Sequence, residues 1–196
     1  MFSAASACET FSSARRGSFE SRLPRALRTV EQPWGKNRET LRDYEFEQLQ
    51  TANSIVRFVL AFFKKCIQHR VPFIIENPAS SLLWLLPEFV ALMASTDVCS
   101  VVFDMCLFKS LHKKRTRLLG YMVDLPSFFD NKTCPGRKVC SVTGLPHHLL
   151  TGAFKGVFRT RAAKEYPPLL CRSLADTFEE SFRRSLLNDL WAHVRY

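Results

Sequence analysis

Two groups of residues in this sequence have types and spacings that could support chemistry. The first centres on Glu76, which stands with Asn77 and Pro78 directly after the apolar run 71–75. A short apolar run that ends in Glu-Asn-Pro is typical of a buried strand. In open α/β folds, ligands bind at the carboxyl ends of the strands. Glu76 is therefore a candidate functional carboxylate, and the alternative is a residue that only turns the chain before the next helix.

The second group is Cys134, Cys140 and His147, in the order Cys-x5-Cys-x6-His. Thiolates and imidazoles are the usual ligands of a structural Zn²⁺ ion, which binds four of them. Cys106 or Cys171 could provide the fourth ligand from a distance. The cysteine spacing is wider than in common zinc sites, where about two to four residues separate the pair. A loop without metal therefore stays open as the alternative.

Cys8 is a candidate nucleophile near the start of the chain. It is flanked by small residues and followed by Arg15 and Arg16. Nearby cations favour the thiolate, which is the nucleophilic form of cysteine. An ordinary thiol with no role in catalysis is the alternative.

Composition limits the class of protein. The 196 residues suit one domain, and a hydrophobic content of 46% argues against a wholly disordered chain. A net charge of +10 fits a polyanionic partner, with nucleic acid such as DNA first, and a basic surface that only faces solvent is the alternative. No stretch reaches the length of a membrane span, and the first residues lack the pattern of a secretory signal. We therefore expect a nuclear or cytoplasmic protein without a membrane partner, whose cysteines are thiols or ligands.

The periodicity of apolar residues predicts the elements that would position these groups. Residues 1–37 lack a sustained apolar period and predict a flexible arm, followed by a single α/β domain over 38–196. Steps of three and four residues predict a helix over 38–69 that Asn37 could cap. The remaining predictions are strands over 72–76, 99–106 and 117–123, helices over 87–95 and 162–196 (the latter broken by Pro167-Pro168), and loops over 124–161. This order fits an α/β sheet with crossover helices.

The order of three motifs resembles the cytosine-5 DNA methyltransferase family. Cys8-Glu9-Thr10-Phe11-Ser12 is similar to the loop that carries the family's nucleophile, and Glu76-Asn77 is similar to its Glu-Asn-Val motif. The run Lys113-Lys114-Arg115-Thr116-Arg117 is similar to its Gln-x-Arg-x-Arg motif. The form Glu-Asn-Pro, together with Ser81-x-x-Trp84 and Tyr166-Pro167-Pro168, looks more like the divergent relatives found in phages and mobile elements.

The resemblance implies a mechanism and a set of site residues. Cys8 would be the nucleophile that attacks carbon 6 of a flipped cytosine, and Glu76 would bind the edge of the ring. Arg115 would contact the base or orient the loop, and Arg117 would support it. The family uses S-adenosylmethionine as methyl donor and a Rossmann-like sheet to bind it. A basic turn before a strand remains the alternative role for the two arginines.

The sequence also departs from the family pattern. Ser6-Ala7 replaces the usual Pro-Pro, Pro78 replaces a valine, and only seven residues precede Cys8 where the glycine-rich cofactor loop belongs. We therefore expect an incomplete Rossmann-like sheet, in a truncated protein that is inactive alone or uses a second chain for its cofactor half. The alternative function is a nonenzymatic nucleic-acid-binding module with structural zinc. An unrelated α/β interaction protein is a third hypothesis.

Overall fold

The computed structural model describes residues 9–12, 15, 24–150, 153–154, 157–159, 163 and 165–193. Its main sheet contains β1 (Phe73–Pro78), β2 (Val98–Asp104) and β3 (Arg115–Tyr121). The longest helices are α2 (Asp43–Gln68) and α5 (Pro168–His193), and the short helices are α3 (Pro87–Met93) and α4 (Leu125–Phe129). Three short 3-10 helices, η1 (Arg38–Thr40), η2 (Leu82–Leu85) and η3 (Met105–Phe108), and a small hairpin of β4 (Ala153–Phe154) with β5 (Val157–Phe158) complete the order.

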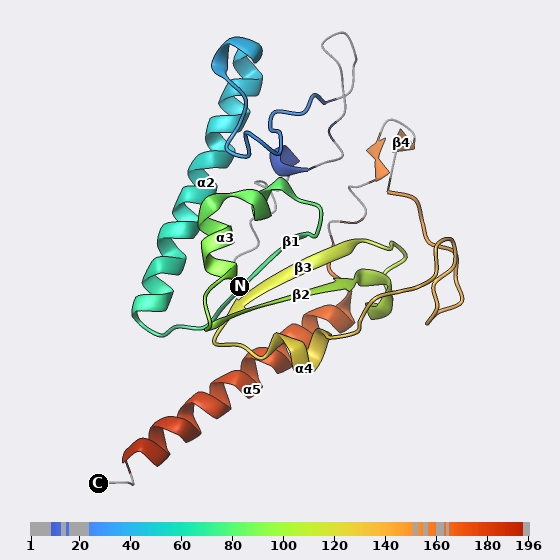
Figure 1. The fold of residues 1–196 in the computed structure, drawn as a ribbon. Coiled ribbons are helices and arrows are strands. Elements are labelled where there is room, and N and C mark those ends of the chain that lie inside the picture. The colour runs from blue at the N-terminus through green and yellow to red at the C-terminus, as the bar shows by residue number, and fades with distance from the viewer. Residues whose placement is uncertain are drawn as a thin grey trace.

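The molecule has three layers, with α2 and α3 on one face of the sheet and α4 and α5 on the other (Figure 1). Side chains alternate between the two faces of each strand, so each face buries its own set of apolar residues. Phe73, Ile75 and Leu119 pack toward α2 and α3, in a cluster that includes Phe63 and Phe89. The opposite face contributes a second cluster, which consists of Val101, Phe103, Met105, Phe108, Leu118, Val123, Leu125, Phe129, Leu170 and Leu174.

The strand order is β1-β3-β2, and both pairings are antiparallel. β1 and β2 therefore run in the same direction, but β3 lies between them. A Rossmann-like sheet contains neighbouring parallel strands, and the strands described here form no such pair. The expectation of a mixed α/β fold is confirmed, whereas the arrangement of this sheet differs from the expected one. The sequence order of three strands does not define which of them pair, because strand pairing depends on tertiary contacts.

Helix α2 forms where the apolar period predicts it, with one face buried through Leu49, Val56 and Phe63. The helix begins after Arg42 rather than after Asn37, which precedes η1 and makes no side-chain cap. The Glu45 carboxylate accepts a hydrogen bond of 3.0 Å from the Arg42 backbone N–H, which satisfies one of the donors at this end. The predicted cap is therefore wrong by five residues.

Part of the segment 1–37, which the sequence predicts to be a flexible arm, is buried in the structure. Phe11 is fully buried in the cluster beneath α2 and α3, and Leu27 packs with Leu41 and Leu49. The helix predicted over 162–196 is confirmed over Pro168–His193, and α5 begins at Pro168 because proline fits the first turn of a helix. The described residues 163 and 165–167, which precede it, are not part of an α-helix.

Candidate metal centre

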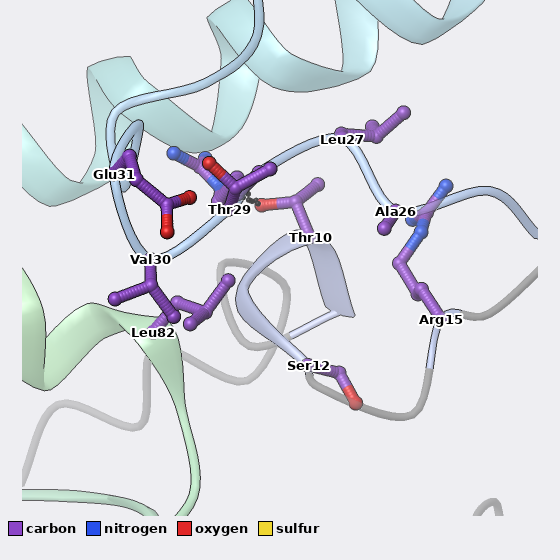
Figure 2. A pocket seen from close by; sticks show the side chains of 10 residues that line it. Thr10, Ser12, Arg15, Ala26, Leu27, Thr29, Val30, Glu31 and Leu82 are labelled. Atoms are coloured by element: carbon purple, nitrogen blue, oxygen red, sulfur yellow. Dashed lines mark hydrogen bonds between the residues drawn. The ribbon is translucent and has the colours of Figure 1, made fainter.

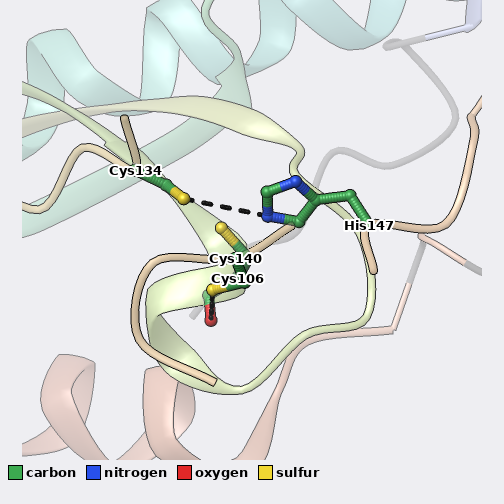
Figure 3. Close-up of side chains that lie close together, drawn as sticks. All are labelled: Cys106, Cys134, Cys140 and His147. Atoms are coloured by element: carbon green, nitrogen blue, oxygen red, sulfur yellow. Dashed lines mark hydrogen bonds between the residues drawn. The ribbon is translucent and has the colours of Figure 1, made fainter. Parts of the chain in front are cut away.

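Cys106, Cys134, Cys140 and His147 converge on one point at the end of the sheet (Figure 3). Their ligand atoms all lie within 4.8 Å of one another. The three cysteines are buried and His147 is half-buried. The sequence predicted three of these residues and left Cys106 or Cys171 as the fourth. The structure selects Cys106, because Cys171 is exposed on α5.

A tight hairpin brings Cys140 and His147 together. Val139 pairs with Pro146 in an antiparallel bridge. The Cys140 N–H donates to the Leu145 carbonyl at 2.9 Å, and the Gly144 N–H donates to the Cys140 carbonyl at 2.9 Å. Gly144 has φ +68°, a left-handed conformation that glycine adopts without the steric cost of a side chain. The local turn chemistry therefore sets the spacing between the last two ligands.

Two charged groups, one buried and one half-buried, hold the backbone around Cys134 in place. The Asp104 carboxylate accepts a hydrogen bond of 2.8 Å from the Cys134 N–H, and Asp104 ends β2 two residues before Cys106. The Lys113 ammonium donates to the carbonyls of Cys134 and Gly136 at 2.6 and 2.9 Å. The last residue of β2 and the segment before β3 thus position a loop that is about 30 residues away in sequence from Asp104.

The histidine is oriented for coordination through Nε2. This atom lies 3.8 Å from the Cys134 Sγ, and the other ring nitrogen, Nδ1, lies 3.2 Å from the Arg137 carbonyl. Metal-binding histidines usually donate their second N–H to a carbonyl or carboxylate, which fixes the tautomer and the ring plane. The carbonyl of Arg137 is in position to do this.

The donor set fits zinc. Three thiolates and one imidazole form a common structural zinc shell, with Zn–S near about 2.3 Å and Zn–N near about 2.0 Å. Ligand atoms in such a tetrahedron are separated by about 3.5–3.8 Å. The distances between the ligand atoms would therefore have to shorten by only about 1 Å or less for the four residues to coordinate one ion. All four positions are filled by protein, which is the arrangement of structural rather than catalytic zinc sites.

The protonation states of the cluster also favour metal binding. Burial acts to raise the pKa of Cys140, but hydrogen bonds from Thr143, Val142 and His147 outweigh it and lower the pKa to about 6. Burial raises the pKa of Cys106, and its contacts with the other two cysteines act in the same direction. For His147, burial opposes protonation, yet the Arg137 carbonyl and the two nearby thiols raise the pKa. At neutral pH Cys140 is therefore largely a thiolate. A metal cation can displace the protons that remain on the other ligands.

Glu76 lies outside this cluster, at the sheet face that packs on α5. The Tyr166 hydroxyl donates to its Oε2 at 2.7 Å, and the Lys114 ammonium lies 3.3 Å from its Oε1. The side chain of Glu76 is 12% exposed. The carboxylate is therefore held by a phenol and an ammonium at the edge of the core, and one of these partners, Tyr166, comes from a motif singled out in the sequence.

The structure does not bring Arg115 and Arg117 to Glu76. Arg117 pairs in register with Asn77, whereas Glu76 pairs with Leu118, so the two side chains point to opposite faces of the sheet. The Arg117 guanidinium lies 5.5 Å from the centre of the Trp84 ring, on the side of α3. Arg115 is exposed at the start of β3. Cys8, the expected nucleophile, lies outside the described residues.

Sequence reasoning did not identify Asp104 and Lys113 as supporting residues of the centre. Asp104 was part of a strand prediction, and Lys113 was assigned to a basic motif. Both residues lie close to Cys106 in the sequence, and this closeness could have indicated their supporting role, because residues beside a metal ligand often orient the ligands.

No protein-family model, curated protein or solved structure matches this chain. In the part of the chain that the structure describes, no helix is long and apolar enough to cross a membrane. The candidate metal centre therefore has to be interpreted from its own geometry.

Proposed function

We propose that this protein is a nucleic-acid-binding module in which a structural zinc ion shapes the binding surface. The proposal rests on the charge of the segments that surround the Cys3His cluster. We call residues 105–115 and 131–150 the Cys/His lobe. The two segments contact each other, since the His148 N–H donates to the Leu111 carbonyl at 2.8 Å.

The Cys/His lobe contains seven lysines and arginines and no aspartate or glutamate. Lys113 and Lys114 make the internal contacts described above. The other five are exposed: Lys109, Arg115, Lys132, Arg137 and Lys138. A cluster of exposed cations without acids is the electrostatic signature of a surface that binds phosphates. This concentration of charge supports nucleic acid more strongly than the net charge of the whole chain does.

Zinc would stabilise the fold here and would not take part in catalysis. The hairpin that carries Arg137 and Lys138 also carries Cys140 and His147, so the metal would fix the two cations relative to the sheet. Without the ion, we expect the hairpin to lose this fixed position and the surface to bind more weakly.

The test is a binding titration of the zinc-loaded chain against fluorescent DNA and RNA oligonucleotides at several salt concentrations. Binding through phosphates predicts a linear fall of log K with log salt, whose slope reports the number of contacts. The double variant Arg137→Gln/Lys138→Gln should lower the magnitude of this slope by about two, which corresponds to the loss of about two phosphate contacts. The matched control is Lys64→Gln/Lys65→Gln, which removes two exposed charges from α2.

The control variant should keep the native slope. The proposal is wrong if the native chain does not bind any of the oligonucleotides at low salt, or if both double variants lose the same affinity. Removal of zinc with a chelator should weaken binding of the native chain, and this result separates the role of the centre from that of the charge alone.

A methyltransferase-like activity is the second candidate, supported by the motif resemblance and by the ordered carboxylate of Glu76. In that case a Rossmann-like sheet and the S-adenosylmethionine site would require strands outside the described residues or a second chain. The test is covalent trapping on DNA that contains 5-fluorocytosine, with S-adenosylmethionine added. A native adduct that Cys8→Ser abolishes would support this candidate, and no adduct from folded protein would rule out activity of the chain alone.

A further inference from the structure

The Cys/His lobe exposes apolar side chains as well as cations. Its large apolar residues that are between 47% and 65% exposed are Leu111, Val139, Val142, Leu145 and Leu149. Exposed apolar residues that gather in one part of a surface mark a place where another molecule binds. Phosphates alone would bind to the cations and would leave these side chains in water. The lobe therefore favours a partner that has apolar groups beside its negative charges.

Four of these exposed or half-buried residues meet where the two segments of the lobe touch. We call Leu111, His112, His148 and Leu149 the histidine patch. The His148 N–H donates to the Leu111 carbonyl at 2.8 Å, and the His112 Nδ1 lies 3.3 Å from the His148 carbonyl. Leu111 is 50% exposed and Leu149 is 65% exposed. The backbone of the patch is thus held in place, while its apolar side chains remain accessible to solvent.

The two imidazole rings of the patch are held at a fixed angle. Their centres lie 5.7 Å apart and their planes meet at 83°, which is a T-shaped pair. This contact covers at most one face of each ring. His148 is the more exposed of the two residues, so at least one face of its ring is available to a ligand. Histidine is one of the residue types on which an unstacked nucleic-acid base can stack.

Two exposed cations lie beside the histidine patch. The His147 N–H donates to the Lys138 carbonyl at 2.7 Å, and the His147 Nδ1 lies 3.2 Å from the Arg137 carbonyl. Residues 137–138 therefore run next to residues 147–148. Arg137 and Lys138 are both exposed, and the lobe contains no aspartate or glutamate that would compete for them. Phosphates can bind here next to bases that contact the patch.

These features distinguish between two classes of nucleic acid. In a duplex, stacking covers the faces of the bases, and a protein reaches only phosphates, sugars and base edges. In a single strand, the bases can leave the stack and contact apolar or aromatic side chains, while the phosphates bind nearby cations. Only the single strand would use both the cations and the histidine patch.

The described residues also line a cavity of about 320 Å³, on segments that do not belong to the lobe (Figure 2). Its cation Arg28 is only 2% exposed. The guanidinium donates to the Thr10 hydroxyl and the Pro33 carbonyl, and the Phe11 ring lies 3.5 Å from its central carbon. Protein groups already hold this cation, so the cavity does not present it to a ligand. The exposed residues of the lobe form the stronger candidate surface.

We propose that the Cys/His lobe binds single-stranded nucleic acid, with a base stacked on the His148 ring beside Leu111 and Leu149 and the adjoining phosphates on Arg137 and Lys138. This inference rests on the proposed nucleic-acid-binding function and narrows its ligand to the single strand. The contacts involve bases and phosphates, which single-stranded DNA and RNA share.

The experiment titrates fluorescent oligonucleotides of one length with the zinc-loaded full chain at several salt concentrations. The probes are a single strand as DNA and as RNA, the corresponding DNA duplex, and a strand in which abasic sites replace all bases. Affinities are extrapolated to about 1 M salt, where the logarithm of the salt concentration is zero and the counterion contribution vanishes. There the single strands should bind at least about fivefold more tightly than the duplex and the abasic strand, because only they provide bases for stacking.

Variants of the patch test the stacking contact. His148→Ser should weaken single-strand binding at least about fivefold and leave binding of the duplex and the abasic strand unchanged. His148→Phe should restore it, and His69→Ser, at the exposed C-terminal end of α2, should bind as the native chain does. Leu111→Ser should also weaken single-strand binding, whereas Val90→Ser on α3, which changes a side chain with the same 50% exposure, should not. Zinc content is measured for each variant, and Leu111→Ser decides if His148→Ser loses the metal.

The outcomes separate this inference from the proposed function. Equal extrapolated affinities for the single strand, the duplex and the abasic strand would overturn the inference and leave the proposed function standing. Equal effects of His148→Ser and His69→Ser would do the same. Poly-L-glutamate represents an acidic protein partner, and the inference is also overturned if it binds as tightly as the single strand. A chain that binds no oligonucleotide at low salt would instead refute the proposed function, and the inference with it.

Discussion

Removal of zinc should open the Cys/His lobe and leave the sheet intact. The apolar contacts of the centre itself are few, since its cluster consists of the three cysteines with Leu107 packed against them. Several large apolar side chains of the lobe are at least half exposed and add little to its stability: Leu111, Val142, Leu145 and Leu149. By contrast, the two large clusters on the sheet faces contain no metal ligand. The segment 131–150 of the lobe would therefore depend on a bound metal, whereas the sheet would not. Residues 105–108 stay anchored without metal, because Met105 and Phe108 belong to the second sheet-face cluster.

The magnitude follows from the linkage between binding and folding. When free zinc exceeds its dissociation constant about a thousandfold, binding stabilises the folded lobe by about 4 kcal/mol. Loss of this free energy raises the population of the open lobe about a thousandfold. Hydrogen exchange of the backbone amides over residues 131–148 should accelerate by about the same factor after treatment with a chelator, if the amides exchange through this opening.

Hydrogen exchange with mass spectrometry measures this effect segment by segment. Cys134→Ser should reproduce the effect of the chelator, and Cys171→Ser should not, because that thiol is exposed on α5. Amides of β1 and β3 should exchange at the native rate in both cases. Unchanged exchange over 131–148, or equal acceleration in lobe and sheet, would refute the reasoning.

Three other predictions concern the groups around the candidate metal centre and around Glu76. Zinc affinity should fall by about tenfold for each unit by which the pH is lowered, for each proton that zinc displaces. The fall should be steeper below about pH 6, where Cys140 becomes protonated. Competition titrations from pH 5 to 8 measure this slope. Asp104→Ala should weaken zinc binding about 10- to 100-fold, since it removes the acceptor that orients the ligand loop. Tyr166→Phe should lower the free energy of unfolding by about 1–3 kcal/mol through loss of its bond to Glu76, as measured by urea denaturation.

Matched variants make these predictions specific. Asp130→Ala changes an exposed aspartate close to the lobe and should keep native zinc affinity. Tyr44→Phe changes a tyrosine that is 58% exposed on α2 and should change the unfolding free energy by less than about 0.5 kcal/mol. A constant slope across pH 6, or equal effects of a variant and its control, would contradict the corresponding prediction.

The sequence predicted β1, β2, β3, α2, α3 and most of α5 to within a few residues, because their periodicity is local. Helix α4 (Leu125–Phe129) falls in the stretch 124–161 that was predicted to be loops, and this prediction is wrong there. The buried face of α2 repeats every three to four residues, and the strand before Glu76 is a short apolar run. The cap of α2 was not predictable in the same way, because η1 separates Asn37 from the helix. The donor of the capping interaction is the backbone N–H of Arg42, which almost any residue type supplies. Only the acceptor, Glu45 in the first turn, carries a residue-type signal.

Strand pairing and the faces of the sheet could not be predicted from local patterns. The position of β3 between β1 and β2 places Glu76 and Arg117 on opposite faces, although they belong to motifs that the resemblance groups together. The fourth metal ligand could not be predicted for the same reason, because it depends on tertiary packing. Cys106 and Cys171 were equivalent as distant cysteines, and only the packing of η3 against the loop brings Cys106 to the cluster.

X-ray absorption spectroscopy at the zinc edge, on protein purified without added metal, tests the central claim most directly. The structure predicts one zinc ion per chain, bound by three sulfur atoms at about 2.3 Å and one nitrogen at about 2.0 Å. Cys106→Ser should lower the sulfur count, and Cys171→Ser should leave the spectrum unchanged. Folded protein that binds no zinc, or a shell without sulfur ligands, would contradict the proposed centre.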